Sequence, residues 1–84
     1  MPSRDEIAGT VREIFQSTLK IEPDKLKDET RLSDDLSLDS LDMVEVVYEL
    51  EDRFDVQIPE DKITEIRTFG EVVDGLHGAV EAKD

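Results

Sequence analysis

The chain has 84 residues, no cysteine, and 23 acidic against 10 basic side chains, which gives a formal net charge of −13. A chain this short supports one hydrophobic core, so we expect a single domain over residues 1–84. The lack of cysteine excludes disulfides and any thiol chemistry by the chain itself. The negative charge argues against binding nucleic acid, which requires cations that neutralise phosphates.

No apolar run approaches the roughly 18 residues needed to span a bilayer, so we expect no stable membrane insertion. The N-terminal residues are charged and lack the apolar stretch of a signal peptide, which indicates a cytoplasmic protein. The acidic surface favours basic protein partners through electrostatic steering of the encounter. On composition alone, acidity that serves only solubility explains the charge equally well.

The first expected helix covers residues 4–19. Its apolar side chains recur at steps of three and four residues, as on one helical face: Ile7, Val11, Ile14 and Phe15. Ser3 and Glu6 have the spacing of a capping box at its start. Pro23 prevents easy continuation of the helix.

Residues 20–38 are predicted to form a long, ordered loop with a short turn between Pro23 and Lys27. Loops of this length are uncommon in compact domains and are often functional. Apolar side chains spread along the segment should pin it across the helices: Ile21, Leu26, Leu32, Leu36 and Leu38.

The helical period returns strongly over residues 40–54. One sector of this helix carries the apolar side chains expected to face the core: Met43, Val46, Val47, Leu50 and Phe54. Ile58-Pro59 ends the element, and residues 60–66 form a short one. A second capping-box pair, Thr68 and Glu71, opens the last helix. The pattern predicts an all-α fold with three longer helices and one short helix.

The opposite sector of the residue 40–54 helix is acidic, with two apolar side chains, Leu41 and Tyr48, beside the acids. Residues 34–61 hold eleven Asp or Glu against one Arg, so most of the net negative charge gathers here. Charges that steer and apolar groups that are desolvated on contact suit a docking surface. The alternative is an ordinary solvated face with two incidental hydrophobic residues.

Ser40 stands where the loop meets this helix, a place where Ser or Asp usually serves only as a cap. A nucleophilic serine needs a positioned base, and the single histidine, His77, is far along the chain. We therefore predict no catalytic residue. Ser40 could instead accept a group from the active site of another protein, because a helix N-terminus favours an attached phosphate.

The segment 34–42, Asp-Asp-Leu-Ser-Leu-Asp-Ser-Leu-Asp, resembles the modification motif of acyl carrier proteins, an Asp-Ser-Leu core in an acidic, leucine-containing stretch. Downstream, residues 44–47, residues 50–55 and the Ile58-Pro59 pair are similar to the second helix of that family and the turn after it. The resemblance covers essentially the whole chain, in size and helix order as well as in motif.

This resemblance implies a four-helix bundle with a long loop between its first and second helices. It implies that a phosphopantetheinyl transferase esterifies Ser40 with 4′-phosphopantetheine from coenzyme A. The thiol of that arm would carry acyl chains as thioesters in fatty acid or polyketide-type biosynthesis. The expected partners are acyl-transferring and ketosynthase-type enzymes with basic docking patches, and the carrier itself is expected to be a monomer and not an enzyme.

The resemblance also assigns residues to two further surfaces. The partner-binding residues would be Asp39, Leu41, Asp42, Glu45, Tyr48, Glu49 and Asp52. An acyl chain would enter between the second and third helices, near Val44, Phe54, Ile58, Ile63 and Ile66. For each of these apolar residues, simple core packing is an equally good explanation.

Two positions depart from the family pattern: Ser37 stands where many members have Gly, and Tyr48 where Met is common. Both bear on which enzymes the chain serves. A peptidyl or aminoacyl carrier is the nearest alternative, but those carriers more often have Gly-Gly-His-Ser or Gly-Gly-Asp-Ser at the motif and are less acidic. An unmodified acidic adaptor, in which Ser40 is dispensable, is another alternative.

A calcium-binding loop is the last alternative that the charge suggests. An EF-hand counted from Asp35 would have Ser40 at the sixth position and Val46 at the twelfth, where Gly and Glu are needed. The pattern fails, and no metal site is predicted.

Overall fold

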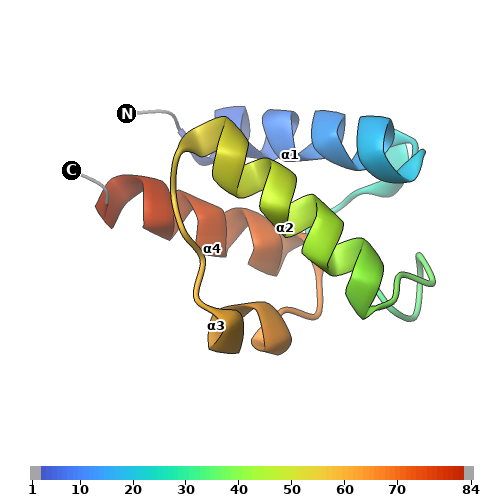
Figure 1. Ribbon diagram of the computed structural model, residues 1–84. Coiled ribbons are helices and arrows are strands. Elements are labelled where there is room, and N and C mark those ends of the chain that lie inside the picture. Colours follow the sequence, from blue (N-terminus) through green and yellow to red (C-terminus); the bar gives the residue numbers. More distant parts are fainter. Residues whose placement is uncertain (1–2, 83–84) are drawn as a thin grey trace.

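The computed structural model describes residues 3–82, and within them the chain forms four α-helices and one short 3₁₀ helix (Figure 1). In chain order these are α1 (Arg4–Leu19), η1 (Pro23–Lys25), α2 (Ser40–Phe54), α3 (Glu60–Glu65) and α4 (Phe69–Ala82). The predicted all-α fold with three longer helices and one short helix is confirmed. The ends of the expected domain, residues 1–2 and 83–84, lie outside the described residues.

Helix α1 packs against both α2 and α4, so these three helices enclose the core. In the sequence the short α3 lies between α2 and α4. Figure 1 shows it on the opposite side of the molecule from α1. None of the helices in the described part of the chain has the length and apolar character needed to cross a membrane.

The core is built from the apolar faces that the periodicity predicted. Its largest fully buried side chains are Ile7, Val11, Phe15, Leu26, Val46, Leu50, Phe69, Val73 and Leu76. The rings of Phe15 and Phe69 meet edge to face, with centroids 5.6 Å apart, which joins α1 to α4. Arg12 lies over the Phe69 ring, 5.0 Å from its centroid, and donates a hydrogen bond to the Leu26 carbonyl at 3.0 Å. The loop after α1 is thereby held to the same cluster.

The loop between α1 and α2 is ordered by burial and by backbone hydrogen bonds. Leu26 and Leu32 are buried, as expected of side chains that pin the segment. The Leu32 N–H donates to the Arg67 carbonyl at 3.0 Å, and the Phe69 N–H donates to the Thr30 carbonyl at 2.9 Å. Because these bonds join the loop to the start of α4, the chain reaches α2 along a fixed path.

Candidate functional site

The residues just before α2 fix where Ser40 lies. The Leu38 N–H donates to the Leu32 carbonyl at 3.0 Å, which folds the end of the loop back on an earlier part of it. Ser37 has a φ of 57°, the left-handed region that favours glycine. The turn that it makes directs the chain into α2, whose first residue is Ser40.

Asp39, and not Ser40, caps α2. The Asp39 Oδ1 accepts a hydrogen bond from the Asp42 N–H at 2.9 Å, and the Asp42 Oδ2 accepts one from the Asp39 N–H at 3.3 Å. This reciprocal pair is a capping box made from two aspartates. The Ser40 hydroxyl is therefore not needed to cap the start of the helix.

The Ser40 side chain is exposed and makes no hydrogen bond to any other residue that the structure describes. Among residues 3–82 no base is hydrogen-bonded to Ser40, and the single histidine, His77 on α4, pairs with Glu81, Nε2 to Oε1 2.9 Å. No group of His, Asp and Glu among residues 3–82 has the arrangement of a metal site. The hydroxyl can accept a group but has no means of activating itself.

Ser40 lies on the edge of a hollow of about 580 Å³. Its apolar lining comes from Leu32, Leu38, Met43 and Ile66, and its polar lining from Arg31, Ser33, Asp34, Asp39, Ser40 and Arg67. The two arginines were not predicted as site residues. No spacing in the sequence relates them to each other or to Ser40, and only the fold brings them together.

The exposed face of α2 carries three large apolar side chains on successive turns: Leu41, Val44 and Tyr48, with exposed fractions of 65%, 57% and 70%. We call these three residues the apolar stripe. Acids surround it, with Glu45, Glu49 and Asp52 exposed and Asp42 half-buried. Val44 was expected near the acyl chain, but its side chain lies on the outer face of the helix with Leu41 and Tyr48.

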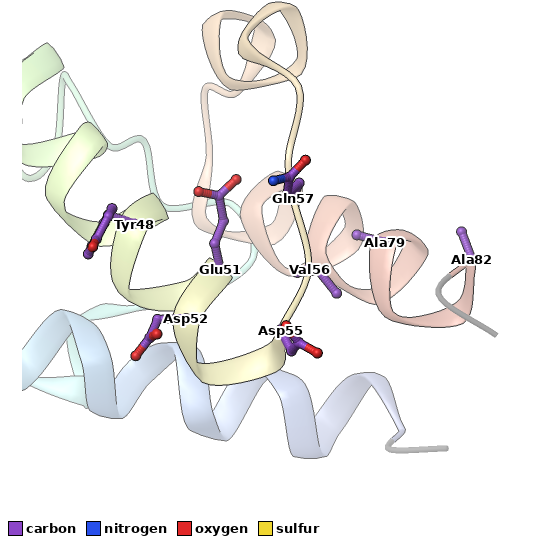
Figure 2. Close-up of a pocket in the computed structure, with 8 residues that line it drawn as sticks. All are labelled: Tyr48, Glu51, Asp52, Asp55, Val56, Gln57, Ala79 and Ala82. Carbon is purple, nitrogen blue, oxygen red and sulfur yellow. The ribbon is translucent and has the colours of Figure 1, made fainter.

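Tyr48 and Asp52 of this face also line a second hollow, of about 690 Å³, at the far end of α2 (Figure 2). Its lining combines Tyr48, Glu51, Asp52 and Asp55 with Val56 and Gln57 of the next loop and Ala79 and Ala82 of α4. Glu51 has a structural role here, because its Oε2 accepts the Ile58 N–H at 2.7 Å. The hollow extends the acidic surface from the apolar stripe toward the end of α4.

A third cleft, of about 610 Å³, lies between α2, α3 and α4. Its apolar lining includes Val47 of α2, Ile58, Ile66, and Val72 and Leu76 of α4. Of the five residues expected to meet an acyl chain, Ile58 and Ile66 line this cleft. Phe54 packs against the core, and neither Phe54 nor Ile63 lines the cleft.

Comparison with known proteins bears directly on this arrangement. Residues 9–76 match the model of a family described as the phosphopantetheine attachment site. An acyl carrier protein of Chlorobium phaeovibrioides is 44% identical over 69 residues, which are 82% of this chain and 88% of that protein. A meromycolate extension acyl carrier protein of Mycobacterium leprae is 38% identical over 71 residues, which are 84% of this chain and 62% of that protein.

Solved structures agree on the fold. An acyl carrier protein of Enterococcus faecalis superposes with a TM-score of 0.77 at 33% identity, over 93% of this chain and 99% of that one. An acyl carrier protein of Thermotoga maritima superposes with a TM-score of 0.85 over 96% of this chain and 94% of that one. At 23% identity, the second likeness concerns the fold alone.

The chain therefore belongs to the phosphopantetheine-attachment family and, within it, to the acyl carrier proteins. Its cofactor is 4′-phosphopantetheine, and the family interacts with biosynthetic enzymes as a carrier of their intermediates. The resemblance inferred from the motif around Ser40 is confirmed.

Proposed function

We propose that Ser40 is the attachment point of the arm and that the chain carries acyl groups on it as thioesters, without catalysing a reaction itself. The observation that carries this proposal is the exposed Ser40 hydroxyl, which is left unbonded because Asp39 caps α2. In the loading step a phosphopantetheinyl transferase would remove the hydroxyl proton. The Ser40 oxygen would then bond to the phosphorus next to the pantetheine of coenzyme A and displace the nucleotide.

The docking surface for this transferase and for acyl-transferring and ketosynthase-type enzymes is the exposed face of α2. We place the apolar stripe at its centre and the predicted acids around it: Asp39, Asp42, Glu45, Glu49 and Asp52. The stripe would be desolvated on contact, while the acids steer basic patches toward it. Val44 joins this surface in our proposal, because a side chain that is 57% exposed cannot line an interior pocket.

The cargo would be sheltered by the cleft between α2, α3 and α4. Its apolar lining by Ile58, Ile66 and Leu76 is suited to an alkyl chain, because burial of apolar surface is favourable. We propose a fatty-acid-type cargo, in line with the meromycolate extension named for the Mycobacterium leprae relative. We further propose that the carrier works as a monomer in the cytoplasm.

A thiol titration tests the carrier role, because the chain has no cysteine of its own. The protein is incubated with coenzyme A and a broad-specificity transferase and then freed of small molecules. One thiol per chain is expected after loading and none before. That thiol should disappear on acylation and return after hydroxylamine, which cleaves thioesters. A titre of zero after incubation would favour the unmodified acidic adaptor.

A further inference from the structure

We propose that Arg31 and Arg67 form a binding site for the phosphodiester of the arm, in the hollow beside Ser40. This inference rests on the proposed attachment at Ser40 and adds a counter-charge for the group attached there. Both arginines line the same hollow as Ser40, although they come from the loop before α2 and from the segment between α3 and α4.

Backbone contacts hold the two arginines in neighbouring positions. Arg31 forms an isolated antiparallel bridge with Thr68, and the Leu32 N–H donates to the Arg67 carbonyl at 3.0 Å. On the other side, the Arg67 N–H donates to the Glu71 Oε1 at 2.9 Å. The pair is thus fixed at its backbone, and only the long side chains need to turn for both guanidinium groups to reach a common anion.

The start of α2 supplies less of this counter-charge than a helix N-terminus ordinarily does. The Asp42 N–H is already bonded to the Asp39 carboxylate, and the carboxylates of Asp39 and Asp42 offset the positive end of the helix dipole. Asp34 also lines the hollow. A phosphodiester attached to Ser40 would therefore stand among carboxylates, and like charges at short range repel.

The Arg67 guanidinium is available for such an anion. It donates to two backbone carbonyls, of Thr64 at 2.8 Å and of Ile66 at 3.4 Å. Within residues 3–82 it forms no ion pair with a carboxylate, and its charge acts on the Glu71 carboxylate only from a longer distance. A guanidinium presents a planar fork of donors that matches two phosphate oxygens. Such a charged bond is stronger than those that Arg67 makes in this structure.

Arg31 is held only weakly. Its Nη1 lies 3.4 Å from the Asp34 Oδ2, and both side chains are about two-thirds exposed, at 67% and 69%. Exposed pairs of this kind contribute little to stability. Arg31 can therefore turn from Asp34 toward the phosphodiester at small cost. Arg4 and Arg53, in contrast, pair with acids on other parts of the surface, Arg4 with Asp74 and Arg53 with Glu13.

The first arm of the test compares the apo protein with the phosphopantetheine-loaded protein by NMR of the arginine Nε–H groups, with loading checked by intact mass. The signals of Arg31 and Arg67 should shift on loading, and that of Arg53 should not. Loading that leaves both signals unmoved would overturn this proposal alone. No gain of mass would overturn the attachment at Ser40 and this proposal with it.

The second arm compares the melting temperatures of apo and loaded forms in wild type, in R31Q/R67Q and in the matched control R53Q. The measured quantity is the melting temperature of the loaded form minus that of the apo form. This difference should be roughly 1 to 4 °C lower in the double variant than in wild type. The gap should close in high salt, and R53Q should behave as wild type. Equal apo-to-loaded differences in wild type and R31Q/R67Q would overturn the proposal. Should the double variant fail to fold, R67Q takes its place.

Discussion

The carboxylates of Asp39 and Asp42 each accept a hydrogen bond from the backbone N–H of the other residue, at 2.9 and 3.3 Å. This exchange caps the start of α2 and leaves the Ser40 hydroxyl outside the cap. The start of the helix thus separates two tasks that a serine at this place would otherwise combine. Asp39 stabilises the helix, and the Ser40 hydroxyl stays free for the attachment that we propose.

Asp39→Ala should lower the free energy of unfolding by about 1 kcal/mol, the usual cost of losing an N-cap. Ser40→Ala, one residue later, should change it by about 0.5 kcal/mol or less, because its exposed hydroxyl has no bond to lose. Urea unfolding followed by circular dichroism measures both. Equal losses in the two variants would mean that Ser40 takes part in the cap.

Ser37→Gly should raise the free energy of unfolding by about 0.5 to 1 kcal/mol. A φ of 57° strains a residue that has a Cβ, and relief of that strain outweighs the added freedom of glycine in the unfolded chain. Ser33→Gly is the matched control, because Ser33 is not among the positive-φ residues. It should be neutral or destabilising. A Ser37→Gly variant less stable than wild type would contradict the argument.

Val44→Ala should mainly lower affinity for the transferase, whereas Val47→Ala should mainly lower the stability of the fold. Val44 is 57% exposed on the apolar stripe, so its truncation should weaken transferase binding and leave stability within about 0.5 kcal/mol. Val47 is 3% exposed, and loss of its two methyl groups should cost about 1.5 to 3 kcal/mol.

Surface plasmon resonance with the transferase and urea unfolding separate these two effects. Unchanged affinity in Val44→Ala would remove Val44 from the docking surface.

Glu71→Gln should lower stability at neutral pH and have no effect in acid. The Glu71 carboxylate accepts backbone N–H bonds from Arg67 and Thr68, both at 2.9 Å, which lower its pKa below the ordinary value of 4.5. A lowered folded-state pKa contributes stability that is complete above the unfolded pKa and is lost as the pH falls through the folded one. The expected loss at pH 7 is about 0.5 kcal/mol.

The check is urea unfolding of wild type and Glu71→Gln between pH 7 and pH 3, with the exposed Glu65→Gln as control. The difference between wild type and Glu71→Gln should vanish toward the low end of this range. A difference that is constant with pH would show that the carboxylate charge does not support this turn.

The three longer helices could be predicted from the sequence because each has a periodic apolar face and a capping residue at its start, and Pro59 marked the start of the short α3. The first and last helices begin with the pairs Ser3–Glu6 and Thr68–Glu71, whose capping boxes the structure contains. The exposed position of Val44 could also have been found. It is three residues from Leu41 and four from Tyr48, which are neighbouring positions on one helical face.

What the sequence did not indicate depends on contacts between distant segments. The bridge between Arg31 and Thr68 joins two stretches that show no strand pattern, and it is this bridge that brings Arg31 beside Arg67. The left-handed conformation of Ser37 could likewise not be predicted from the residue itself, because serine has no preference for it. The family pattern of Gly at that position was its only signal.

The most direct test of the central claim is the intact mass of wild type and Ser40→Ala after incubation with coenzyme A and a broad-specificity phosphopantetheinyl transferase. We predict a gain of one phosphopantetheinyl group in wild type, localised to Ser40 by fragmentation of the loaded peptide, and no gain in the variant. A folded wild-type protein that gains no mass, or a Ser40→Ala variant that still does, would contradict the account.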